Sequence, residues 1–249
     1  MRNIKLTIEF DGTCFGGWQS QKNARAVQDV VNAAIHKLTG EMIDVMGSSR
    51  TDSGVHALGL IANFRTESSI PPDKFAYALN TVLPEDVVIR KSEEANVDFH
   101  ARYGAKRKKY RYLILNSTYP SAIMRYRAYH VDKRLNFGAM QEAVPYFLGT
   151  HDFSAFRASG SKIRSSERII METSLDKRED ILEFEITGNG FLYNMVRIIA
   201  GTLVDVGMGR IAPYDIPSII ESKDRRKAGI TAPAHGLYLV EVFYSNDKK

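Results

Sequence analysis

The segment GSSRTDSGVHA, residues 47–57, places one carboxylate in a short polar stretch that glycines bound. Asp52 follows Arg50 by two residues, precedes Gly54 by two, and is followed four residues later by His56. An ionised carboxylate can act as a nucleophile or accept a proton. Asp and Gly also favour turns, so a purely turn-forming segment is the alternative. A turn has no need for an Arg beside the Asp, and this favours a ligand-binding loop.

Positive charge is concentrated in two parts of the chain. Between Arg102 and Arg134 there are ten Lys or Arg residues and a single acidic residue, Asp132. Tyrosines lie among these cations in the same stretch, including Tyr103, Tyr110, Tyr112, Tyr126 and Tyr129. A solvated charged face is the alternative, but cations neutralise phosphates and aromatic rings stack on unpaired bases. The second basic run is opposed only by Glu167 and consists of Arg157, Lys162, Arg164 and Arg168. Together the two runs favour a nucleic-acid partner.

The composition is that of an ordinary globular protein in a reducing compartment. The 249 residues are 44% hydrophobic and 25% charged, with a net charge of +5 and a pI near 9.2. The only cysteine, Cys14, cannot form an internal disulfide. The first residues do not resemble a signal peptide, and no apolar run reaches the ~18–20 residues that span a membrane. We therefore expect a cytoplasmic protein without a membrane partner.

Neither a metal site nor a cofactor site is predicted. The six histidines do not pair with another His or Cys at a short metal-ligand spacing. Neither a Walker loop nor a GxGxxG fingerprint occurs. The glycine-rich stretches at 188–191 and 207–210 fit a tight turn and the end of a helix better than a phosphate cradle.

Hydrophobic periodicity predicts the elements that position Asp52. Alternation from Ile4 to Phe10 predicts a strand, and helical spacing from Val27 to Leu38 predicts a helix that Gly40 ends. The first half continues with strands at 42–47 and 58–66, a helix opened by Pro71 and Pro72, and a strand at 86–91. Asp52 then falls in the loop between the second and third strands.

The second half repeats this order. It contains strands at 109–115, 168–175, 181–187 and 237–244, and helices at 137–148 and 192–206. Two β-α-β-β-α-β units are typical of ferredoxin-like folds. The predicted class is α+β, with the two units joined into one mixed/antiparallel sheet, helices on one side and a central cleft. The units are expected at 1–103, with the Asp loop, and at 104–249, with the basic runs.

RTDSGVHA resembles the catalytic motif of the TruA family of tRNA pseudouridine synthases. The resemblance covers essentially the whole chain, through the segments 10–21, 106–114, 149–160, 188–203 and 234–242. It implies isomerisation of uridine to pseudouridine at nucleotides 38 to 40 of the tRNA anticodon stem-loop. It also implies that no cofactor or metal is needed, and that a homodimer binds tRNA through both subunits.

Roles for single residues come from this resemblance and from the chemistry. Asp52 would be the nucleophile, and the sequence leaves open whether it attacks the uracil, attacks the sugar or assists a glycal path. Arg197 would pair with Asp52 and keep it ionised. It shares a predicted helix face with Tyr193 and Gly201, although a solvent-facing Arg is the alternative.

Tyr110 would stack on the target base, with a core position in a half-buried strand as the alternative. Arg50 would fill the gap left when the nucleotide leaves its stack. The residues expected to bind phosphates are Arg107, Lys108, Lys109, Arg157, Lys162 and Arg164.

Two other functions use much of the same sequence. A non-catalytic RNA-binding protein would need the basic runs but not the RTDSG loop. An N-glycosidase would use similar groups but release free uracil.

Overall fold

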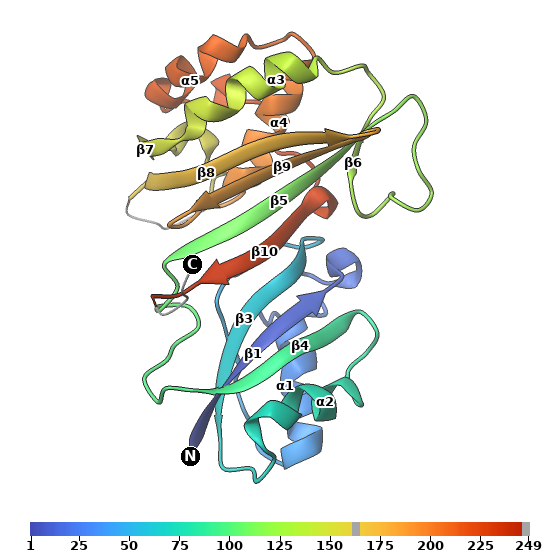
Figure 1. The fold of residues 1–249 in the computed structure, drawn as a ribbon, viewed down its shortest axis with the longest axis vertical. Helices are drawn as coiled ribbons and strands as arrows, with labels where there is room; N and C mark the ends of the chain where they lie inside the picture. Colours follow the sequence, from blue (N-terminus) through green and yellow to red (C-terminus); the bar gives the residue numbers. More distant parts are fainter. Residues whose placement is uncertain (161–164, 246–249) are drawn as a thin grey trace. The chain divides into compact units, whose positions relative to one another are not determined.

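The computed structural model describes residues 1–160 and 165–245 (Figure 1). In these ranges the protein has an α+β fold with five α-helices and ten strands, most of them paired antiparallel. The chain forms two compact units: unit 1 is Met1–Lys106 with the described residues from Tyr238 on, and unit 2 is Arg107–Leu237. No helix within the described ranges is both long enough and apolar enough to span a membrane.

The sheet of unit 1 is built around β1 (Arg2–Phe10), which pairs antiparallel with β3 (His56–Thr66) on one side and β4 (Val87–Ala95) on the other. The short β2 (Met46–Gly47) pairs antiparallel with β3. The last strand, β10 (Leu237–Phe243), runs parallel to β3 where β3 begins. Alternate residues of β1 (Ile4, Leu6, Ile8) are fully buried, as expected for a strand with one face on a core.

Two helices cover one face of this sheet, α1 (Val27–Thr39) and α2 (Phe75–Asn80) (Figure 1). α1 buries Val27, Val31 and Ile35 completely, which are positions on one helical face. It ends as predicted at Gly40, which has a φ of 74° and donates its N–H to the carbonyl of His36. Glycine adopts this left-handed conformation without steric cost.

Unit 2 has the strand order β5 (Arg107–Asn116), β9 (Ile181–Gly188), β8 (Glu167–Arg178) and β7 (Gly149–Asp152), with all neighbours antiparallel. The short β6 (Tyr129–Val131) pairs parallel with β5. Figure 1 shows three helices gathered on one side of this sheet: α3 (Phe137–Ala143), α4 (Met195–Gly207) and α5 (Ile216–Ser222). α4 is buried on almost every side and forms the centre of the unit 2 core.

The structure differs from the sequence prediction at several elements. The strand expected at 42–47 is reduced to Met46–Gly47. The helix expected at 137–148 ends at Ala143 and continues as a 3₁₀ turn, because Pro145 has no N–H to continue the α-helical pattern. The closing strand forms as predicted, yet it pairs with β3 of unit 1. The elements not predicted are β6, β7 and α5, which have few residues each.

The contact of α4 with the segment before β10 gives a stability prediction. A Cβ on Gly201 would lie 2.0 Å from the carbonyl oxygen of Ile230, so Gly201→Ala should lower the free energy of unfolding by about 1–3 kcal/mol. Gly138 in α3 is the matched control, because its Cβ would meet only Asn136 Oδ1, at 3.5 Å. Gly138→Ala should raise the stability by about 0.5 kcal/mol through better helix propensity. Urea unfolding measures both, and equal effects of the two substitutions would contradict the packing described.

Candidate active site

The RTDSG loop, residues 48–55, connects β2 to β3, which confirms the predicted location of Asp52. Its first residue is tied to β3 twice: the Ser48 N–H donates to the Ile61 carbonyl at 2.7 Å, and the Ser48 hydroxyl accepts the Ile61 N–H at 3.2 Å. Arg50 is exposed, Thr51 is buried and Asp52 is half-buried. Asp52 is therefore partly accessible, while Ser48 and Thr51 before it in the loop are packed against unit 1.

The backbone after β1 approaches this loop too closely for a side chain to lie between them. Gly17 has a φ of 108°, and a Cβ there would lie 2.3 Å from the carbonyl oxygen of Thr51. A Cβ on Gly12 would lie 2.0 Å from the carbonyl oxygen of Val55. The Trp18 N–H donates to the Thr51 carbonyl at 3.2 Å. Only glycine permits these contacts at both positions.

A second set of hydrogen bonds fixes the tip of the loop. The Gly54 N–H and the Ser53 hydroxyl both donate to the carbonyl of Phe15, at 3.3 and 3.2 Å. The Val55 N–H donates to the carbonyl of Asp52 at 3.2 Å, which closes a turn with Gly54 at a φ of 79°. Hydrogen bonds on both sides of Asp52 thus fix its backbone: one is made by Thr51 before it, and the other closes the turn after it.

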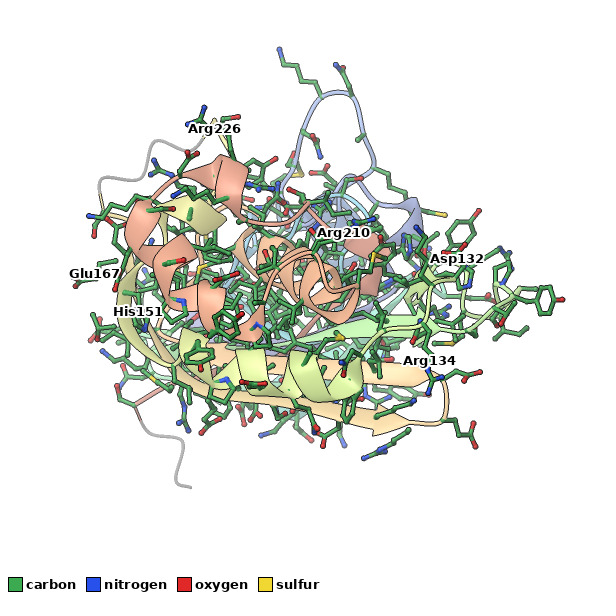
Figure 2. All side chains as sticks on the ribbon, turned by 90° about the horizontal axis from the view of Figure 1, so that it is seen from above. Asp132, Arg134, His151, Glu167, Arg210 and Arg226 are labelled. Carbon is green, nitrogen blue, oxygen red and sulfur yellow. The ribbon has the colours of Figure 1, made fainter. Side chains whose placement is uncertain are left out.

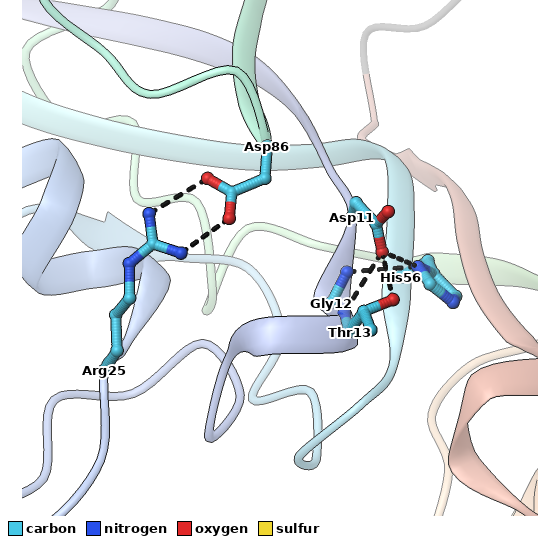
Figure 3. Close-up of polar contacts among 6 residues, drawn as sticks. All are labelled: Asp11, Gly12, Thr13, Arg25, His56 and Asp86. Atoms are coloured by element: carbon cyan, nitrogen blue, oxygen red, sulfur yellow. Dashed lines mark hydrogen bonds and ion pairs between the residues drawn. The ribbon is translucent and has the colours of Figure 1, made fainter. Parts of the chain in front are cut away.

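His56 joins the end of the loop to the turn after β1 (Figure 3). The imidazole is 2% exposed and stacks on Tyr238 with ring centroids 4.7 Å apart. Its Nδ1 lies 3.0 Å from the Gly12 N–H nitrogen and 3.1 Å from Asp11 Oδ1. These contacts compete for one nitrogen, which accepts from Gly12 when unprotonated and donates to Asp11 when protonated. The Asp11 carboxylate also accepts from the N–H and the hydroxyl of Thr13.

An exposed ion pair between Arg25 and Asp86 stabilises the same turn after β1 (Figure 3). The Arg25 guanidinium donates to both carboxylate oxygens of Asp86, at 2.5 and 3.0 Å, and this hydrogen bonding raises the pKa of Arg25. Arg25 also lies over the ring of Phe15 at 4.1 Å. The Asp11 N–H donates to the Asp86 carbonyl at 3.0 Å. The segment that contacts the loop is therefore itself fixed to Asp86, the residue before β4.

Tyr110 and Tyr112 lie on one face of β5 in unit 2, as their spacing predicted. Tyr112 is fully buried, and its hydroxyl donates to the carbonyl of Pro233 at 2.7 Å. Burial raises the pKa of Tyr112 well above its ordinary value. Tyr110 is 9% exposed, and its ring meets Phe191 edge-on with centroids 5.1 Å apart. Tyr112 is thus a core residue, and Tyr110 has an aromatic support behind its ring.

Two basic residues on the opposite face of β5 pair with glutamates of β9. Lys109 Nζ lies 2.5 Å from Glu185, and Arg111 lies 2.9 Å from Glu185 and 3.3 Å from Glu183. Desolvation opposes ionisation of Glu185, but hydrogen bonds from Lys109 and Arg111 outweigh it and lower its pKa. The charge of Lys109 is therefore largely matched within the protein. The neighbouring Arg107 and Lys108 are half-buried at the start of the strand, and Arg107 lies 4.0 Å from Glu172.

Arg197 is held by backbone and side-chain acceptors within unit 2. Its Nε donates to the Ala232 carbonyl at 2.7 Å, and its Nη1 donates to Asn194 Oδ1 at 2.9 Å. Gly201, one turn later on α4, faces the carbonyl of Ile230. This face of α4 packs on the segment before β10, so the alternative of a solvent-facing Arg197 is wrong.

The start of α4 differs from the prediction. The helix was expected from Leu192, but it begins at Met195, because Asn194 has a left-handed φ of 60°. Tyr193 precedes the helix and is 45% exposed. It therefore does not share the helix face of Arg197.

Of the other predicted phosphate-binding residues, the structure describes only Arg157. Arg157 is half-buried and follows the 3₁₀ turn Ser154–Phe156, while Lys162 and Arg164 lie outside the described residues. Two exposed basic residues outside that predicted set, Arg134 and Arg226, lie well apart on unit 2 (Figure 2). Arg226 pairs with Asp224 at 2.7 Å.

Across residues 1–160 and 165–245, no three His, Cys, Asp or Glu side chains are grouped as a metal site requires. Unit 1 has a hollow of about 440 Å³ between the segment 42–46, β3 and residues 98–100. Asp52 does not line this hollow.

The contact of the two backbones in unit 1 can be tested with Gly17→Ala. The added Cβ would displace the Thr51 carbonyl, and the positive φ adds strain, so we expect a loss of about 2–4 kcal/mol in stability. Gly40→Ala is the control, because Gly40 has a similar φ but nothing within 4 Å of the added Cβ. It should cost only the backbone strain, about 1–2 kcal/mol. Hydrogen exchange of residues 48–55 should rise in Gly17→Ala alone, and unchanged exchange there would contradict the described contact.

The chain is similar in sequence to known proteins over almost its whole length. A family model described as tRNA pseudouridine synthase matches residues 6–104 and 143–245. A tRNA pseudouridine synthase A of Acetivibrio thermocellus is 62% identical over 244 residues, which cover 98% of this chain and all of the relative. Proteins of the same name from Ruminiclostridium cellulolyticum and Thermoanaerobacter sp. (strain X514) are 58% and 51% identical with the same coverage. With a family model across most of its length and relatives this similar, the chain belongs to the tRNA pseudouridine synthase family.

Proposed function

We propose that this protein isomerises uridine to pseudouridine at nucleotides 38, 39 and 40 of the tRNA anticodon stem-loop. The observation that carries the proposal is the half-buried Asp52 on a loop whose backbone is hydrogen-bonded on both sides. The neighbouring segment after β1 carries Gly12 and Gly17 where its backbone approaches the RTDSG loop. A loop that only reverses the chain would not need such a close contact. Such rigidity is expected where a nucleophile must be held in a defined orientation.

The reaction needs a carboxylate but no change in oxidation state. The bond from the sugar C1′ to N1 of uracil breaks, the base rotates, and a bond from C1′ to C5 forms. The proton on C5 is lost and N1 gains one, so atoms and charge balance. Asp52 can attack the base, attack the sugar or remove a sugar proton on a glycal path, and each route needs an ionised carboxylate at the uridine.

Arg197 is the proposed partner that keeps Asp52 ionised. An arginine close to a carboxyl group favours the charged form and lowers its pKa. The bonds from Arg197 to Ala232 and Asn194 orient the guanidinium. A guanidinium has five N–H donors, so two such bonds are compatible with a carboxylate partner.

Tyr110 is proposed to hold the flipped uracil, and Arg50 to occupy the space that the nucleotide leaves. The edge contact with Phe191 supports the Tyr110 ring in one orientation. Arg50 is exposed beside Asp52, where it can reach RNA. The proposed phosphate contacts are Arg107, Lys108, Lys109, Arg157, Lys162 and Arg164. Among these, Lys109 would have to exchange Glu185 for a phosphate.

The finer points of fold and assembly are also proposals. By the family resemblance, residues 1–103 and 104–249 would each form a ferredoxin-like unit, and their sheets would join around a central cleft. By the same resemblance, a homodimer in the cytoplasm would bind tRNA through both subunits. The strand order β4-β1-β3-β2 in unit 1 supports the ferredoxin-like arrangement.

The function is tested with an unmodified tRNA transcript carrying uridines at 38 to 40, without metal or nucleotide. Wild-type protein should form pseudouridine at these positions and release no free uracil. Asp52→Ala and Asp52→Asn should lower the rate at least about a thousandfold, because they remove the reacting carboxylate, and should still bind tRNA. Tight binding without product by folded wild-type protein would instead identify a non-catalytic RNA-binding protein, and release of uracil would identify a glycosidase.

The different surroundings of Arg157 and Lys109 predict different salt dependence of tRNA binding. Each phosphate contact contributes about 0.7–0.9 to the slope of log K against log salt concentration. Arg157→Gln should reduce this slope by about that amount. Lys109→Gln should reduce it by less than half as much, since Glu185 already balances the Lys109 charge. A titration of tRNA binding from low to moderate salt measures both slopes, and a larger effect of Lys109→Gln would refute this ranking.

A further inference from the structure

Thr51, next to the proposed nucleophile, has a buried hydroxyl for which the described residues provide no hydrogen-bond partner. The residue is 8% exposed, and its Oγ1 is out of contact with solvent. Its backbone is fixed, because the carbonyl accepts the Trp18 N–H. Buried polar groups are almost always hydrogen-bonded, so an unpaired hydroxyl at this position requires an explanation.

An unpaired buried hydroxyl makes the folded protein less stable than an apolar group of the same shape would. Valine is nearly isosteric with threonine and would fill the same volume without this penalty. The hydroxyl can still contribute to function if it gains a partner in a second state of the loop. A hydrogen bond made only in the reacting state accelerates the chemical step without strengthening binding of the substrate.

We propose that Thr51 is a positioning residue whose hydroxyl gains a hydrogen bond only when the target uridine reaches its reacting position at the RTDSG loop, and that this bond holds Asp52 in its reacting orientation. The proposal rests on the proposed function. Because Oγ1 is covered in the free protein, the bond requires a small rearrangement around the Thr51 side chain in the reacting state, while the backbone hydrogen bonds of the loop remain. Asp52 is half-buried and shares a peptide bond with Thr51, so any such change is transmitted to its carboxylate.

The test compares Thr51→Val, Thr51→Ser and Thr173→Val in the full-length protein. Thr173 on β8 is the matched control, because its Oγ1 is also buried without a partner among the described residues and it lies in unit 2. Both valine variants should raise the Tm of the free protein by about 2–4 °C or more. Thr51→Val should lower the single-turnover rate of pseudouridine formation at saturating enzyme about tenfold, with less than a twofold change in the Kd for tRNA. Thr51→Ser should restore the rate, and Thr173→Val should leave it unchanged.

Each other outcome overturns a defined part of the account. A lower Tm for Thr51→Val would show that the hydroxyl is already bonded in the free protein and is structural. A wild-type rate in Thr51→Val would overturn its role in positioning while leaving the proposed function intact. If the wild-type protein formed no pseudouridine, the proposed function would fail, and the role of Thr51 with it.

Discussion

The direct contact between two stretches of backbone in unit 1 is the constraint on which the position of Asp52 depends. The turn after β1 and the RTDSG loop share hydrogen bonds from Trp18 to Thr51 and from Gly54 to Phe15. The approach is close enough that only glycine fits at positions 12 and 17. Since the loop is irregular, it lacks the repeated hydrogen bonds of a strand or helix. Bonds to a neighbouring backbone replace them, and they fix the backbone from which the side chain of Asp52, the proposed nucleophile, projects.

In unit 2 the candidate residues are held in place by the chain just before β10. Ala232 and Pro233 accept hydrogen bonds from Arg197 and Tyr112, so α4 and β5 are both tied to that segment. The opposite face of β5 uses its basic residues differently, with Lys109 and Arg111 paired to the glutamates of β9. The charges of Lys109 and Arg111 are therefore balanced within the protein before RNA binds.

Local sequence patterns predicted the elements whose side chains repeat on one face. The alternation in β1, the apolar face of α1 and its end at Gly40 are examples, and the loop position of Asp52 followed from them. Contacts between segments that are distant in sequence could not be predicted from such local patterns. The need for glycine at 12 and 17 arises from carbonyls of the RTDSG loop, and the pairing of Lys109 depends on a glutamate on another strand. The stretch 229–236, which holds Arg197 through the Ala232 carbonyl, contains Gly and Pro but has no hydrophobic periodicity from which that contact could be predicted. The helix α4 begins later than the apolar spacing predicted, because the left-handed backbone of Asn194 cannot be part of a right-handed helix.

The most direct test of the account is the structure of the Asp52→Asn protein bound to an unmodified anticodon stem-loop, since this variant should bind RNA without converting it. In this complex the target uridine should lie outside its stack, with the uracil ring against Tyr110 and the glycosidic bond within about 3–4 Å of the side chain at position 52. Arg197 should lie within hydrogen-bond distance of that side chain. A uridine that remains stacked in the RNA, with residue 52 away from it and the RNA held only by the basic residues, would contradict the account.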